Sequence, residues 1–113
     1  MNNAEIEQAN ALINKYCPQY KLVIYTTIEG IPVSHEAANA IIDLQKETGR
    51  NILDGYIDYN NNNIGLYYRC AEWKRVLLHE IAHALTEGDK HGGNWEAEYK
   101  RLVKAELGGS DTQ

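Results

Sequence analysis

The 113-residue chain contains no phenylalanine, only two prolines and only two cysteines. Its aromatic bulk comes instead from eight tyrosines and two tryptophans, whose polar groups need hydrogen-bond partners when they are buried. Cys17 and Cys70 form no Cys-x-x-Cys pair, which excludes a zinc ribbon and a thioredoxin-like redox motif. We expect two buried or half-buried thiols at these positions, with a disulfide between them as the alternative.

Long apolar runs are also missing, and none approaches the ~20 residues that a membrane-spanning helix requires. Residues 1–11 are polar and lack the apolar core of a signal peptide. The formal net charge of −5 gives no electrostatic footprint for a nucleic-acid backbone, although a local basic patch at Lys100, Arg101 and Lys104 leaves that alternative open. These absences predict a cytoplasmic protein with no membrane partner, and charge argues against a nucleic-acid partner.

The length and the 43% of apolar residues suit one domain, residues 1–113, in which residues 108–113 form a flexible tail. Asn2 or Asn3 can cap the first helix, and the asparagines at 60–63 can form a hairpin turn because Asn tolerates positive φ. We therefore expect an α+β fold of about three helices packed on a small sheet. Apolar periodicity predicts helices over residues 3–16, 34–48, from about 71 to a stop at Gly88, and 94–107, and strands over 20–28, 52–59 and 64–69.

One stretch carries a chemical signature, His79-Glu80-Ile81-Ala82-His83. Histidines four residues apart lie on one face of a helix, one turn apart, which lets two imidazoles share one cation. Zinc binds neutral imidazole nitrogen and is usually coordinated by four ligands. Glu80 lies about 100° around the helix from His79 and can reach a metal-bound water without being a ligand. The apolar residues of this helix fall on the opposite arc, so that one face packs and the other carries the chemistry.

A third ligand is expected after the helix turns at Gly88, and His91 is the preferred candidate for one Zn²⁺ per chain. Glu96, Glu98 and Asp89 are the alternatives. Three protein ligands leave the fourth position to water, which is the catalytic arrangement. A fourth protein ligand, from Cys70 or a carboxylate, would instead mark a purely structural zinc.

The stretch from His79 to Thr86, followed by His91-Gly92-Gly93-Asn94-Trp95, resembles the SprT-like branch of zincin metallopeptidases. Small members of that family occur in bacteria and phages. In that family the His-Glu-x-x-His helix is followed by a loop and a His-Gly-x-x-aromatic motif. The resemblance covers about the last forty residues by motif. It implies a minimal zincin-like domain with His79, His83 and His91 as zinc ligands, Glu80 as the catalytic acid–base, and Trp95 packing the last helix under the site. The chain lacks the cysteine zinc ribbon of the larger members, which puts a link to DNA-bound substrates in doubt.

The activity that the resemblance implies is hydrolysis of a protein or peptide by a zinc-activated water, with Glu80 as general base. Tyr56, Tyr67, Tyr68 and Tyr99 are candidates for stabilising the oxyanion, and the strand 64–69 is the candidate edge for an extended substrate. The alternative is a zinc-binding interaction or regulatory module with vestigial peptidase activity. The small size of the chain favours this alternative, whereas its complete set of catalytic residues argues against it.

Overall fold

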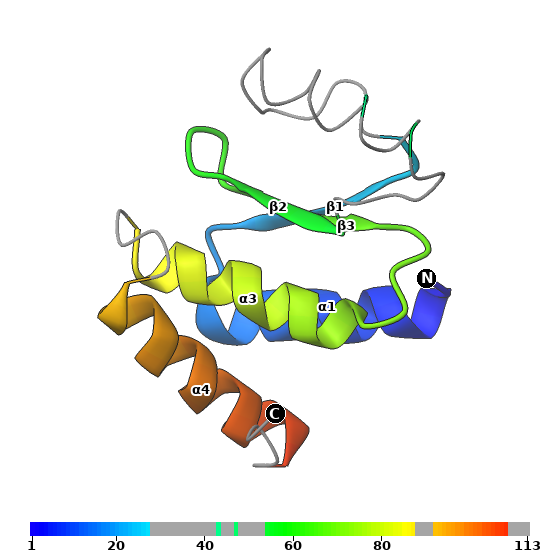
Figure 1. Cartoon of the computed structure of the whole chain (residues 1–113). Coiled ribbons are helices and arrows are strands. Elements are labelled where there is room, and N and C mark those ends of the chain that lie inside the picture. Colours follow the sequence, from blue (N-terminus) through cyan, green and yellow to red (C-terminus); the bar gives the residue numbers. More distant parts are fainter. Residues whose placement is uncertain (28–42, 44–46, 48–53, 88–91, 109–113) are drawn as a thin grey trace.

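The computed structural model describes residues 1–27, 43, 47, 54–87 and 92–108. Within these residues the chain is an α+β fold of three helices and a three-stranded mixed sheet (Figure 1), which confirms the coarse fold class. Apart from the helical residues 43 and 47, the helix predicted over 34–48 lies outside the described residues. The elements are α1 (Asn3–Tyr16), β1 (Lys21–Tyr25), β2 (Gly55–Asp58), β3 (Asn63–Tyr67), α3 (Trp73–Leu85) and α4 (Gly93–Leu107).

α1 begins where the sequence predicts because Asn2 closes a capping box. The Asn2 side-chain oxygen accepts a bond from the Glu5 amide at 2.8 Å, and the Glu5 carboxylate accepts one from the Asn2 amide at 2.9 Å. Two of the unpaired amides at the start of the helix are thereby satisfied. The helix ends at Tyr16, before Cys17 and Pro18, as predicted.

The sheet has the order β1-β3-β2, with β1 parallel and β2 antiparallel to β3. The prediction that residues 64–69 form a sheet edge is therefore wrong, because β3 is bonded on both sides. The turn between β2 and β3 is confirmed, with Asn62 at φ 55°. Asp58, which is 7% exposed, holds this turn by accepting bonds from the amides of Asn60 and Asn61 at 3.1 and 3.3 Å.

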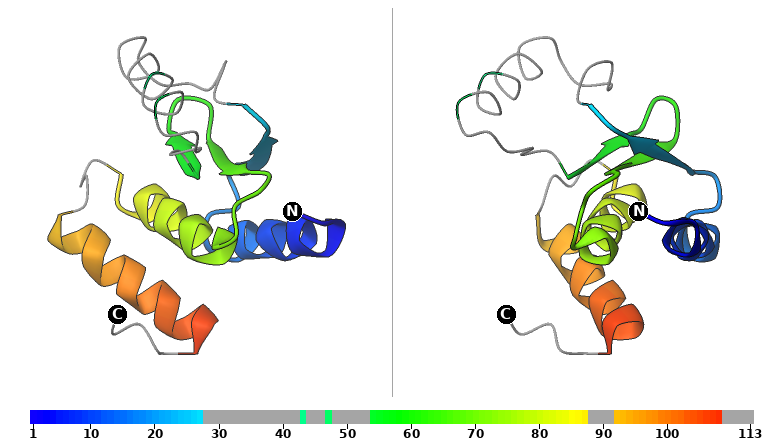
Figure 2. Two further views of the ribbon diagram at one scale, coloured as in Figure 1. Left: turned by 45° about the vertical axis from the view of Figure 1, so that its right-hand side comes forward. Right: turned by 90° about the vertical axis from the view of Figure 1, so that its right-hand side faces the viewer.

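The helices α1, α3 and α4 lie on one face of the sheet. α1 and α3 lie side by side against it, and α4 packs on α3 (Figures 1 and 2). α3 is thus the central element, and Leu77, Leu78 and Ile81 are completely buried in it. No helix in the described part of the chain is long and apolar enough to cross a membrane.

α3 ends at Leu85, so the prediction that it continues to a stop at Gly88 is wrong. The Thr86 hydroxyl donates to the Ala82 carbonyl at 2.7 Å, and the Thr86 amide donates to the same oxygen at 3.0 Å. The hydroxyl competes for the helical carbonyl, and the backbone of Thr86 leaves the helical region at φ −129°.

Cys17 and Cys70 are free and buried, which confirms two thiols rather than a disulfide. Both belong to the main hydrophobic core. Burial raises the pKa of the Cys17 thiol to about 11, and it also raises the pKa of Cys70. Neither thiol has the character of a nucleophile.

Candidate metal centre

The two histidines of the motif converge on one face of α3. The Nε2 atoms of His79 and His83 are 3.3 Å apart, and their ring centroids are 4.9 Å apart. One ligand atom from each of His79, Glu80 and His83 lies within 4.8 Å of the others. Among the residues that the structure describes, no other group of three potential metal ligands comes this close.

The spacing of the two imidazoles fits zinc. Two zinc–nitrogen bonds of about 2.05 Å at a tetrahedral angle place the nitrogens about 3.3 Å apart. The His79 and His83 nitrogens already stand at this separation, 3.3 Å. His83 is 8% exposed and His79 is half-buried, so both rings are largely fixed by packing. The residues present therefore suit the metal that the sequence predicts.

Glu80 lies beside the imidazoles with its carboxylate turned toward β2. It is 7% exposed, and in the described part of the chain no cation forms an ion pair with it. Burial raises the pKa of the Glu80 carboxyl to about 7, because the charged form loses its hydration. A nearby bound cation would favour the carboxylate and bring this pKa down again.

Gly55, the first residue of β2, leaves the space that this carboxylate occupies. A Cβ atom at Gly55 would lie 2.6 Å from Val76 Cγ1, 3.0 Å from the Gly65 carbonyl oxygen and 3.3 Å from Glu80 Oε2. The first of these separations is shorter than real Cβ contacts allow, so the strand approaches α3 this closely only with glycine. A glycine inside a strand pattern is the sequence signal for such an approach, although this role of Gly55 was not predicted.

α4 supplies the opposite wall through two aromatic side chains. The Trp95 indole N–H donates to the His79 carbonyl at 3.2 Å, and the Trp95 ring lies 4.8 Å from the His79 ring and 5.4 Å from the His83 ring. Tyr99 stacks on Trp95 at 5.1 Å and 7°, and it meets His79 at 6.0 Å. Trp95 therefore packs α4 against the site, as predicted.

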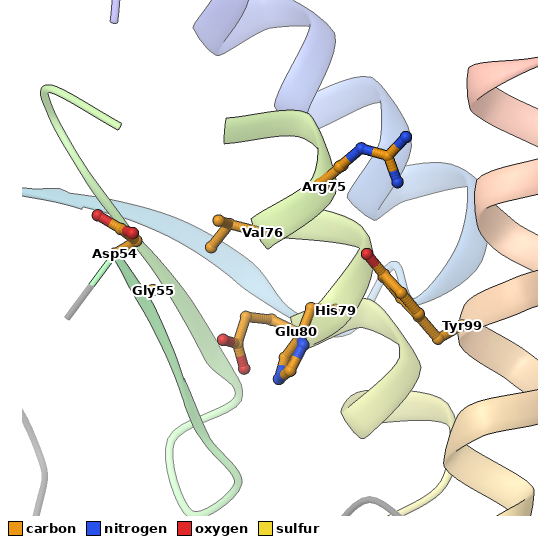
Figure 3. A pocket seen from close by; sticks show the side chains of 7 residues that line it. All are labelled: Asp54, Gly55, Arg75, Val76, His79, Glu80 and Tyr99. Carbon is orange, nitrogen blue, oxygen red and sulfur yellow. The ribbon is translucent and has the colours of Figure 1, made fainter. Parts of the chain in front are cut away.

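An open cavity of about 320 Å³ lies next to Glu80 (Figure 3). Its walls come from the start of β2, from the polar face of α3 and from α4, and no motif in the sequence connects these elements. The lining residues are Asp54, Gly55, Arg75, Val76, His79, Glu80 and Tyr99.

The candidates for the third ligand are not among the residues gathered here. His91 and Asp89 lie outside the described residues, so the preferred ligand stays a prediction. Glu96 pairs with Lys100 at 2.9 Å, and Glu98 accepts from the Nε of Arg101 at 2.7 Å. Both glutamates thus pair with cations of α4, and neither belongs to the group of potential metal ligands around the histidine pair.

The four tyrosine candidates are separated by the fold. Tyr99 lines the cavity. Tyr56 is 8% exposed, and its ring covers Gly65, where a Cβ would lie 2.0 Å from the ring. Tyr67 and Tyr68 contact one another at 5.1 Å and are not among the residues that line the cavity.

No protein-family model, no curated protein and no solved structure matches the chain. The resemblance to SprT-like zincins therefore rests on the motif residues alone.

Proposed function

We propose that the chain is a zinc-dependent peptidase of the SprT-like zincin kind, in which His79, His83 and His91 hold the metal. The observation that carries this proposal is the 3.3 Å separation of the His79 and His83 Nε2 atoms with a buried carboxylate beside them. If the motif were a chance match on a surface helix, there would be no reason for its histidines to converge and to be partly buried.

Glu80 and Trp95 have different roles in the proposed reaction. Zinc, when bound, supplies Lewis-acid polarisation of a carbonyl and a water that is acidic near neutral pH. Glu80 accepts the proton of the attacking water and delivers it to the leaving amine nitrogen. Trp95 fixes His79 through its backbone carbonyl, which keeps the ligand helix in register with α4.

β2 is the strand that we propose for binding an extended peptide, in place of β3. It contacts α3, and no described strand pairs with its second side. An added peptide strand would therefore run past Gly55 and the Glu80 carboxylate.

Of the predicted oxyanion stabilisers we retain Tyr99, since it lines the cavity. Tyr99→Phe should lower kcat about tenfold or more with little change in KM. An unchanged kcat would remove Tyr99 from this role.

Elemental analysis tests the metal. We expect about one zinc per chain in the wild type, loss of zinc in His83→Ala and weakened zinc in His91→Ala. His35→Ala is the matched control, because His35 is the remaining histidine of the four and is not assigned to the site. Absence of zinc after metal addition would contradict the proposal, and full retention in His91→Ala would transfer the third position to another residue.

Hydrolysis is tested on an unfolded protein substrate, with fragments identified by mass spectrometry. Cleavage by the zinc-loaded protein should stop on chelation and return with zinc. Stoichiometric zinc without any cleavage would instead assign the chain to the alternative class, a zinc-binding interaction module.

A further inference from the structure

The cavity beside Glu80 contains a guanidinium that the proposed chemistry does not use. Arg75 precedes His79 by four residues, so it lies on the same face of α3, one turn earlier. It is half-buried. Three ion pairs are found in the described part of the chain, and none of them includes Arg75.

The carboxylates that line the cavity are directed elsewhere. In Figure 3 the Asp54 carboxylate projects from the opposite wall away from α3, and the Glu80 carboxylate turns toward β2. Arg75 extends toward the α4 side, where Tyr99 directs its hydroxyl end toward α3. One end of the cavity is therefore cationic, although the whole chain carries a net charge of −5.

We propose that this end of the cavity binds a carboxylate of the substrate, so that the enzyme cleaves peptides next to an acidic residue or a free carboxyl terminus. This inference rests on the proposed peptidase function. Arginine presents a planar fork that pairs with a carboxylate through two parallel hydrogen bonds. A half-buried cation also loses hydration, and a carboxylate partner offsets that loss.

The surroundings favour a carboxylate over a phosphate. Among the described residues that line the cavity, Arg75 is the only lysine or arginine, and Asp54 and Glu80 would repel a second negative charge. A volume of about 320 Å³ accommodates one side chain of glutamate size beside His79. Because Arg75 lies one helical turn from His79, the bound carboxylate would lie beside the cleaved bond and leave the metal position open.

Peptides that differ at one position next to the cleaved bond test the inference. The zinc-loaded wild type should cleave a capped glutamate peptide about tenfold faster in kcat/KM than its glutamine counterpart, and a lysine peptide more slowly still. Amidated and free-acid forms of the same peptides distinguish a side-chain carboxylate from a terminal one. Equal rates for all forms, or a preference for lysine, would overturn the proposal.

Variants of Arg75 connect the preference to this side chain. Arg75→Gln should abolish the difference between glutamate and glutamine, and Arg75→Glu should shift it toward lysine. Arg69→Gln is the matched control, because Arg69 is exposed, lies 5.0 Å from the Tyr68 ring and does not line the cavity. Arg69→Gln must keep the preference, and a preference that survives in Arg75→Gln would contradict our assignment.

A binding measurement separates this inference from the proposed function. Zinc-loaded Glu80→Gln protein, labelled with ¹⁵N, is titrated with the capped glutamate and glutamine peptides while the Arg75 side-chain Nε–H signal is followed. A shift with the glutamate peptide alone supports the carboxylate site, even if the wild type hydrolyses nothing. The absence of any difference between the two peptides would refute the site, whether or not cleavage occurs.

Discussion

Two glutamates on neighbouring helices show how differently this fold treats a carboxylate. Glu106 of α4 accepts bonds from the Lys15 ammonium at 2.8 Å and from the Tyr16 hydroxyl, both on α1. The hydrogen bond from Lys15, followed by that from Tyr16, lowers the pKa of Glu106. Glu80 of α3 is more deeply buried and has no described ion-pair partner, and burial raises its pKa to about 7.

The difference separates a structural carboxylate from one suited to chemistry. Glu106 links α4 to α1, and its negative charge is already paired with the Lys15 ammonium. Its carboxylate is therefore engaged in the fold. Glu80 keeps its capacity to take up and release a proton, and the approach of β2 at Gly55 fixes its position.

Glu80→Gln should lower kcat/KM by about a thousandfold, because the amide cannot accept the proton of the attacking water. Zinc content should remain that of the wild type, since we assign no ligand role to Glu80. Kinetics on a cleaved peptide and elemental analysis measure both quantities. Glu106→Gln is the control and should leave kcat/KM within a factor of two. Cleavage at the wild-type rate by Glu80→Gln would refute the proposed general base.

Gly55→Ala should reduce the free energy of unfolding by about 1–3 kcal/mol. The new Cβ would lie 2.6 Å from Val76 Cγ1 and 3.0 Å from the Gly65 carbonyl. Gly93→Ala is the matched control, because a Cβ there meets nothing within 4 Å. Urea unfolding measures both variants, and an equal response to the two substitutions would show that β2 does not approach α3 as closely as described.

Trp95→Phe should weaken zinc binding about fivefold, because it removes one hydrogen bond to the His79 backbone while keeping an aromatic ring. Trp73→Phe also removes an indole hydrogen bond, the one to the Glu5 carboxylate at 3.0 Å, which links α3 to α1 and not to α4. Zinc affinity from competition with a chromogenic chelator should fall only in Trp95→Phe. Equal affinities in the two variants would mean that Trp95 does not position the ligand helix.

The pH dependence of stability should show the smallest effect. Because the pKa of Glu106 is lowered in the folded state, its contribution is present above the usual glutamate pKa and is lost as pH falls through the lowered folded value. Glu106→Gln should therefore be less stable than the wild type at neutral pH, and the two should converge in acid. Glu7→Gln, which removes an exposed carboxylate from α1, is the control. Parallel curves for Glu106→Gln and the wild type would contradict the role of the Lys15 pair.

Local signals in the sequence predicted local geometry well. The asparagine cap of α1, the asparagine turn and the one-turn spacing of His79 and His83 depend on a few neighbouring residues, so these features can be predicted without the fold. The reciprocal bond from Glu5 that completes the capping box was not predicted. The position of β3 depends on its pairing with β1, whose residues lie far away in the sequence, and no local pattern announces it. The early end of α3 at Thr86 was missed because threonine also occurs inside helices. The cavity is formed by β2, α3 and α4 together, so no single segment of the sequence predicts it. For the same reason, the sequence gives no sign that Arg75 lines a cavity.

The pairing of β1 with β3 also has a consequence for how the chain folds. β2 and β3 join through a short turn, whereas Lys21 of β1 is in register with Asn63, about forty residues later. Closing so long a loop costs entropy before the contact contributes stability, which makes this parallel pairing the slow event. We therefore expect the hairpin to form first and β1 to dock later.

A truncation of Ile64 in the hairpin should then slow refolding, whereas a truncation of Leu22 in β1 should mainly accelerate unfolding. Stopped-flow refolding of Ile64→Val and Leu22→Ala would reveal the order, and the opposite pattern would place β1 in the folding nucleus.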